Sequence, residues 1–141
     1  MTDSVYQFAV KASNAIGDGL LSSAIIIRAA SVPNAPLVPT KASSTTSSIS
    51  INWLAPSYNG GNALTQYSVY IDDGLGGALT LLTTTANATV LTFTASSLII
   101  SRTYKFSVTA WNQVGQSLNS PSASILCATV PSAPAQPITA S

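Results

Sequence analysis

Few side chains in this 141-residue sequence could carry out acid–base or metal chemistry. The chain has four carboxylates and no histidine, so the most common general base and a frequent metal ligand are both missing. Only Asp72 and Asp73 are adjacent, and Gly74 follows them, which is typical of a turn. The many Ser and Thr hydroxyls are no evidence of a nucleophile without a base to activate one. The sequence therefore predicts no catalytic residue, no metal and no cofactor.

Cys127 and the glycine-rich stretch at 74–77 each allow a chemical and a structural interpretation. Cys127 lies at an inward position of an expected strand, where a thiol packs as a small hydrophobe; a reactive thiol is the alternative. Because Cys127 is the single cysteine, it cannot form an internal disulfide and does not settle the redox compartment. The stretch GLGG at 74–77 is expected at a hairpin tip and not in a phosphate-binding loop, because no helix follows it.

Several polar residues are candidates for glycosylation. Asn87-Ala88-Thr89 is an N-glycosylation acceptor pattern between two expected strands. Ser and Thr together number 38, which suggests O-glycans, although these residues are equally typical of strands and turns. The candidate O-glycosylation sites are Thr83, Thr84, Thr85, Thr129 and Ser132.

Two aromatic residues are candidates for a contact surface. Trp111 follows an inward residue of its expected strand, so its side chain should point outward, and Tyr70 should also point outward on a neighbouring strand. Such a surface could contact another module, a partner chain or a sugar, and an isolated surface aromatic is the alternative.

The composition excludes some classes of partner. Charged residues make up 6% of the chain, and the net charge is +1. This balance gives no electrostatic reason to expect nucleic acid or an anionic membrane as a partner. No run of 18 apolar residues occurs, so membrane insertion of this segment is not expected.

The end of the sequence repeats its beginning at a distance of 98 residues. YQFAVKASNAIGDG at 6–19 aligns with YKFSVTAWNQVGQS at 104–117, and VPNAP at 32–36 aligns with VPSAP at 130–134. Between positions 6 and 43, 17 of 38 residues are identical without a gap. A fixed period of this size indicates tandem modules.

Alternating hydrophobic residues predict an all-β module without helices. The expected strands cover 39–45, 49–53, 65–72, 78–84, 90–95, 104–110 and 123–128. Seven short strands separated by Gly, Asn and Pro turns fit a Greek-key β-sandwich. The expected core residues are Trp53, Tyr67, Leu98, Tyr104 and Phe106.

The motifs of this module resemble those of fibronectin type III repeats. Trp53 precedes Pro56, NGGNALTQYSVY covers 59–70, and Leu98 lies six residues before Tyr104, the spacing of that family's tyrosine corner. Ile100 departs from the family, which usually carries proline there. The resemblance implies a non-catalytic module. It does not imply integrin binding, because the turn at 112–117 lacks Arg-Gly-Asp.

The repeat predicts three parts and stiff joints between them. Residues 1–32 are interpreted as the last two strands of a preceding module, 33–130 as a complete module, and 131–141 as a joint and the start of another module. The alternative is that Met1 is a true start, which would leave a half-module unpaired. Proline-rich joints favour an extended backbone, so each module should advance the chain by roughly 30–40 Å. The joint residues are Pro33, Pro36, Pro131 and Pro134.

These features favour a structural or adhesive protein, part of an extracellular or cell-surface fibre or stalk. Its expected partners are other modules of the same chain, identical chains and glycans. Two alternatives stay open: a receptor or adhesin ectodomain that binds a ligand through loops 56–62 and 112–117, and a non-catalytic spacer of a large secreted enzyme.

Overall fold

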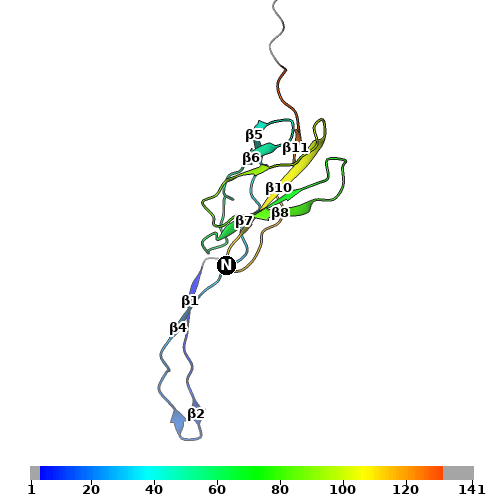
Figure 1. Ribbon diagram of the computed structural model, residues 1–141. Helices are drawn as coiled ribbons and strands as arrows, with labels where there is room; N and C mark the ends of the chain where they lie inside the picture. The colour runs from blue at the N-terminus through cyan, green and yellow to red at the C-terminus, as the bar shows by residue number, and fades with distance from the viewer. Residues whose placement is uncertain (1–3, 132–141) are drawn as a thin grey trace, which may run out of the picture.

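The computed structural model describes residues 4–131, which form a long β-hairpin joined to a β-sandwich (Figure 1). The hairpin (residues 4–29) contains β1 (Val5–Phe8), β2 (Ser13–Asn14), β3 (Gly17–Asp18) and β4 (Ile25–Arg28). A linker (residues 30–36) leads from the hairpin into the sandwich (residues 37–128). The whole is elongated, and the hairpin projects from one end of the sandwich (Figure 1).

The sandwich consists of two antiparallel sheets. One sheet has the order β5-β6-β9, and the other has the order β11-β10-β7-β8. The strands are β5 (Thr40–Ser44), β6 (Ile49–Asn52), β7 (Gln66–Ile71), β8 (Thr80–Thr84), β9 (Thr92–Ala95), β10 (Thr103–Trp111) and β11 (Ala123–Leu126). All seven predicted strands are present, each within a few residues of its expected bounds, and residues 4–131 contain no helix. The prediction of an all-β sandwich is confirmed.

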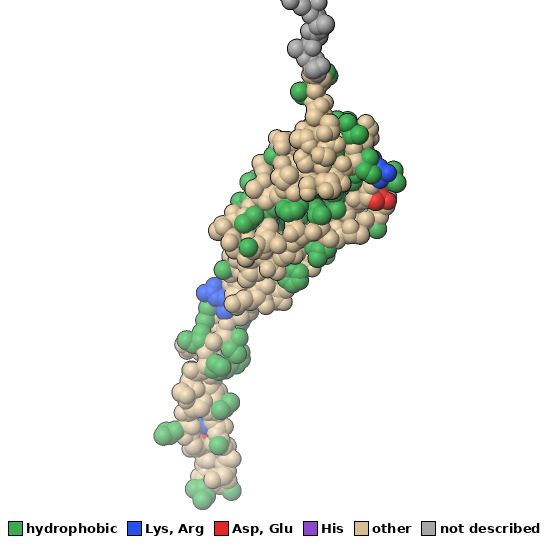
Figure 2. Space-filling model, in the orientation of Figure 1, with side chains coloured by type: hydrophobic (Ala, Val, Ile, Leu, Met, Phe, Trp, Pro, Cys, Tyr) green, Lys and Arg blue, Asp and Glu red, His purple; other side chains and the backbone are tan. Residues whose placement is uncertain are grey.

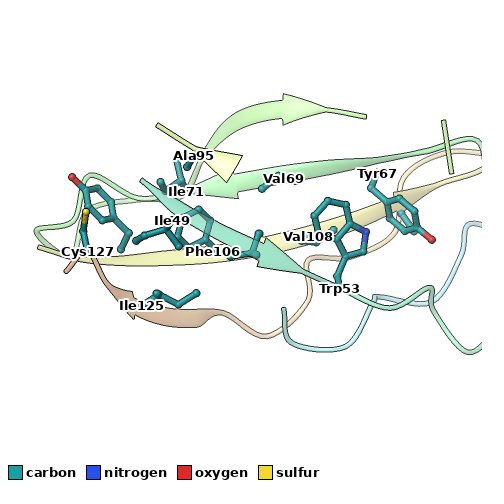
Figure 3. Close-up of a cluster of buried hydrophobic side chains, with 13 residues drawn as sticks. Ile49, Trp53, Tyr67, Val69, Ile71, Ala95, Phe106, Val108, Ile125 and Cys127 are labelled. Carbon is teal, nitrogen blue, oxygen red and sulfur yellow. The ribbon is translucent and has the colours of Figure 1, made fainter. Parts of the chain in front are cut away.

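The core lies between the two sheets and follows the predicted alternation (Figure 3). Trp53 and Tyr67 are buried with their ring centroids 5.7 Å apart in an edge-to-face arrangement. Burial raises the pKa of the Tyr67 hydroxyl. Of the other expected core residues, Tyr104 and Phe106 are buried, and Leu98 is partly buried against the same cluster. Cys127 is fully buried and belongs to this core.

Side chains connect the two sheets at their ends. The Tyr104 hydroxyl accepts a hydrogen bond of 2.9 Å from the backbone N–H of Ile99, so the predicted tyrosine corner forms although Ile100 replaces proline. At the open edge between β5 and β11, Ser44 Oγ donates to the Leu126 carbonyl at 2.9 Å. The same Oγ accepts from the Ala128 N–H at 3.1 Å. These bonds close the sandwich without strand pairing.

Candidate functional site

The linker is bound to the sandwich by backbone hydrogen bonds. The Ser31 N–H donates to the Gly60 carbonyl at 2.8 Å, and the Asn34 N–H donates to the Tyr58 carbonyl at 3.0 Å. Pro33 and Pro36 are buried against the sandwich. Proline also fixes the backbone φ angle, so the linker combines intrinsic stiffness with direct attachment.

The Asn112 side chain also binds the linker. Its Nδ2 donates to the Ser31 carbonyl at 2.7 Å and to the Asn59 carbonyl at 2.8 Å. Its Oδ1 accepts from the backbone N–H groups of Val114 at 2.9 Å and Gly115 at 3.1 Å. Asn112 is buried, and both its donors and its acceptor are used. One side chain thus connects the linker, the loop before β7 and the turn after β10.

The close approach of the linker requires glycine at position 60. Gly60 has a φ of +79°, and a Cβ atom built on it would lie 2.0 Å from the Ser31 carbonyl oxygen. No side chain fits at that distance, so the loop and linker can touch only through a bare backbone. We call this set of contacts among Ser31, Asn59, Gly60 and Asn112 the joint contact.

Of the segment that leaves the sandwich after β11, the structure describes residues up to Pro131. Pro131 is exposed, whereas Pro134 and the candidate Ser132 lie outside the described residues. A groove where the chain leaves the sandwich is lined mainly by Lys41, Ser43, Ser44, Leu126, Ala128 and Thr129. Lys41 is the only titratable group among its lining residues, so the groove offers no acid–base pair.

The predicted outward aromatics lie on the outer face of the second sheet, where their polar atoms are bound within the module. The half-buried Trp111 donates through Nε1 to Ser68 Oγ at 2.9 Å. Gln116 Nε2 donates to the Tyr70 hydroxyl at 2.7 Å and to Thr109 Oγ1 at 2.8 Å. Only part of each ring is therefore available to a partner.

Two serines bind the edge of β10 where its pairing with β11 has ended. The Ser117 hydroxyl accepts from the Ala110 N–H at 3.0 Å, and the Ser120 hydroxyl accepts from the Val108 N–H at 3.0 Å. The N–H groups of the same serines donate to the carbonyls of Ala110 and Val108. The irregular segment after β10 therefore remains fixed to it.

The glycosylation candidates differ in accessibility. Asn87 is exposed, and its Oδ1 accepts from the N–H and the hydroxyl of Thr89, at 2.9 and 2.6 Å. Thr84 and Thr129 are exposed and Thr83 is half-buried. Thr85 is buried, and its hydroxyl accepts from the Tyr67 N–H and donates to the Asn87 carbonyl. Thr85 is therefore not accessible for modification in the folded module.

The two adjacent carboxylates, Asp72 and Asp73, accept hydrogen bonds from backbone amides. Asp72 Oδ1 accepts from the N–H groups of Lys105 and Gly74 at 2.8 and 3.1 Å. Asp73 accepts from Leu75 and Gly77, and these amides hold the pKa of its carboxyl below the usual value. Within residues 4–131 no three His, Cys, Asp or Glu side chains cluster as metal ligands would.

The buried Cys127 thiol donates to the backbone carbonyl of Thr45, an exposed residue, at 3.4 Å. No helix long and apolar enough to cross a membrane occurs in the described part of the chain.

Comparison with known families agrees with this geometry. The fibronectin type III domain profile matches residues 34–126. The chain belongs to the fibronectin type III family. Over 127 residues it is 35% identical to Exoglucanase B of Cellulomonas fimi, covering 85% of this chain but 11% of that protein. The chain thus spans only a small part of that relative's length.

Solved structures of multidomain proteins share the fold. A crystal structure of titin domains superposes with a TM-score of 0.68 at 21% identity, covering 86% of this chain and 40% of that one. A segment of chicken CNTN1 superposes with a TM-score of 0.60 at 20% identity, covering 92% and 44%. Fibronectin type III domains are in general non-catalytic modules.

Sequence reasoning did not identify the residues of the joint contact or the two serines after β10. A signal was present in the repeat, because Asn112 and Ser120 match Asn14 and Ser22 at a distance of 98 residues. Polar residues that recur between modules, while their neighbours change, are expected where a side chain satisfies a backbone group.

Proposed function

We propose that the chain is a structural spacer, a segment of an extended extracellular or cell-surface array of fibronectin type III modules. The observation that carries this proposal is the joint contact, in which the buried Asn112 side chain binds the Ser31 and Asn59 carbonyls. A module that fixes the chain entering it sets the direction of its neighbour, which a spacer needs and an isolated binding domain does not.

The repeat supports several such joints in one polypeptide. VPSAP at 130–134 follows the sandwich as VPNAP at 32–36 precedes it, so an equivalent contact would form with the following module. With stiff joints, the modules add their lengths instead of folding back on one another. The array would then act by separating whatever is attached to its two ends.

The surface chemistry supports an extracellular setting. Charged residues are scarce and hydroxyl groups abundant, and Asn87 and Thr84 are exposed. We propose N-glycosylation at Asn87 and O-glycosylation at Thr83, Thr84, Thr129 or Ser132. A mass decrease of the native polypeptide after enzymatic and chemical deglycosylation would support this; an unchanged mass would exclude glycans on these residues.

Amide hydrogen exchange of the linker tests the spacer function. In the chain 1–141 we expect the Ser31 amide to exchange slowly, because it is bound to the Gly60 carbonyl. Asn112→Asp keeps the turn acceptor but places a carboxylate against two carbonyl oxygens. We expect this variant to accelerate Ser31 exchange by about tenfold or more.

The chain supplies a matched control for this experiment. Asn14 makes the same turn bonds through Oδ1, to Ile16 and Gly17 at 2.9 and 3.2 Å, but holds no linker within the described residues. Asn14→Asp should therefore leave the Ser31 amide protected. Rapid Ser31 exchange in the unsubstituted chain would contradict a stiff joint and hence the spacer function.

A second candidate is a non-catalytic spacer within a large secreted enzyme. The 35% identity to a part of Exoglucanase B favours it. The mass and sequence of the native polypeptide distinguish the two: a catalytic domain in the same chain supports the second candidate, and an array of modules alone supports the first.

A further inference from the structure

The hairpin has the strand pairing of the last two strands of the sandwich. Tyr6 lies opposite Ile27 between β1 and β4, and Tyr104 lies opposite Ile125 between β10 and β11. All four pairs of β1 and β4 have a counterpart 98 residues later in β10 and β11. The hairpin is thus a structural copy of β10 and β11, and not only a sequence repeat.

The side-chain bonds of the hairpin repeat as well. The Ser22 hydroxyl accepts from the Val10 N–H at 3.1 Å, as Ser120 does from Val108. The pair Ser13 and Asp18 in β2 and β3 corresponds to the bridge between Trp111 and Gln116. Because these contacts match, the hairpin has the conformation that its counterpart has in the complete module.

The apolar face of the hairpin lacks the cover that its counterpart has. Phe8 is 53% exposed and Val10 is 74% exposed, whereas Phe106 and Val108 are fully buried. Figure 2 shows hydrophobic side chains along the surface of the hairpin. We use the name hairpin face for the exposed apolar side chains that correspond to inward positions of β10 and β11. Its members are Tyr6, Phe8, Val10, Ile25 and Ile27.

At the paired positions of β1 and β4, the opposite side of the hairpin shows no such difference. Gln7 is exposed, and so is its counterpart Lys105. Ile26 is exposed, and so is its counterpart Ser124. Among the four paired positions of β1 and β4, the contrast is therefore found at the side chains that face the core in the complete module. Beyond them, Ala9 and Lys11 are also exposed, whereas their counterparts Ser107 and Thr109 are buried.

The sandwich shows what would cover the hairpin face. β10 pairs with β7 along its other edge, where Val108 lies opposite Val69 and Ala110 opposite Tyr67. Its inward side chains pack against β6, including Ile49 and Ile51. In the hairpin the corresponding edge, residues 8–12, pairs with no strand of the described chain.

We infer that the hairpin face binds the first five strands of another fibronectin type III unit, equivalent to residues 36–102, located upstream in the same polypeptide. This inference rests on the proposed spacer function and supplies the module on the other side of the joint. A second copy of the chain is a poorer occupant, because its own β10 and β11 already fill that position.

The inference is tested by supplying the missing strands. A copy of residues 36–102 is placed directly before Val5 of the chain, so that Val5 follows Arg102 as Thr103 does. Hydrogen exchange of peptides covering 5–28 is measured in this extended chain and in the chain 1–141. We expect exchange in 5–28 to slow by about a hundredfold or more in the extended chain.

Two substitutions in the extended chain check that the hairpin face is responsible. Phe8→Asp should abolish the protection of 5–28 while the second module remains protected. Gln7→Asp lies on the opposite side of the same strand and should retain the protection of 5–28. Loss of protection in both variants would contradict binding through the hairpin face.

Other outcomes overturn the inference. Equally fast exchange of 5–28 in the extended chain and the chain 1–141 would show that the strands do not dock. Protection of 5–28 in the chain 1–141 that rises with protein concentration would identify a second copy as the occupant. Because Ser31 exchange is read independently, a failed hairpin test with a protected Ser31 leaves the stiff joint standing.

Discussion

At the scale of single residues, polar side chains accept hydrogen bonds from backbone N–H groups that no strand carbonyl accepts. Ser120 accepts from the Val108 N–H where an adjacent strand would otherwise supply a carbonyl. Asp72 does the same for the Lys105 N–H at the other end of β10. The Ser120 bond lies beyond the pairing of β10 with β11, which includes only Thr103 to Phe106. The Asp72 bond continues the pairing of β10 with β7, which ends at Phe106 and Ile71.

Substitution of Ser120 measures what this replacement contributes. Ser120→Ala leaves the buried Val108 N–H without its acceptor, so we expect the free energy of unfolding to fall by about 1–3 kcal/mol. Ser124→Ala changes an exposed serine of β11 and should alter it by less than about 0.5 kcal/mol. Urea denaturation of both variants provides the measurement. Equal effects would show that the Ser120 hydroxyl is not a structural acceptor.

At the scale of elements, the alternation of apolar and polar residues in the sequence predicted which side chains of a strand are buried. Ile49, Ile51 and Trp53 were expected on one face of their strand, and all three are buried. The turn role of Asp73 was also predictable, because its carboxyl accepts from the amides of Leu75 and Gly77, which are close to it in the sequence. Period-2 patterns and short-range turns depend on neighbouring residues, so one sequence suffices to find them.

The joint contact was not predicted, because its partners are far apart in the chain. Asn112 lies 81 residues from Ser31 and 53 from Asn59, and no local pattern relates them. Trp111 and Tyr70 were placed on the correct face, but their bonds to Ser68 and Gln116 depend on how β7 and β10 pair. Long-range polar contacts require the fold before they can be inferred.

Gly60 determines how closely the linker approaches the sandwich. Gly60→Ala would place a Cβ 2.0 Å from the Ser31 carbonyl oxygen, so the linker should detach and Ser31 exchange should accelerate. Gly76→Ala is the matched control, since Gly76 has a φ of +91° but no atom within 4 Å of a built Cβ. Both variants cost about 1 kcal/mol in backbone strain, and only the first should release the linker. Similar Ser31 exchange in both would contradict the close contact.

At the scale of the whole molecule, the hairpin and the sandwich are connected mainly through the linker. β1 packs with β4 and β2 with β3, and no strand of the hairpin packs extensively against the sandwich. Isolated two-stranded hairpins are marginally stable in water. The stability of the sandwich should therefore depend on the linker and not on the hairpin.

Truncation separates these two contributions. Removal of residues 1–28 keeps Ser31 and the buried prolines, so the free energy of unfolding of the sandwich should change by less than about 0.5 kcal/mol. Removal of residues 1–36 also deletes the bonds of Ser31 and Asn34 and the buried Pro33 and Pro36, and should lower it by about 3 kcal/mol. Guanidinium denaturation followed by Trp fluorescence reports on the sandwich in both cases, because both tryptophans, Trp53 and Trp111, lie within it. If the shorter truncation destabilised the sandwich as much as the longer one, the hairpin would contribute to the fold of its neighbour, and the modules could not act as independent units joined by a stiff linker.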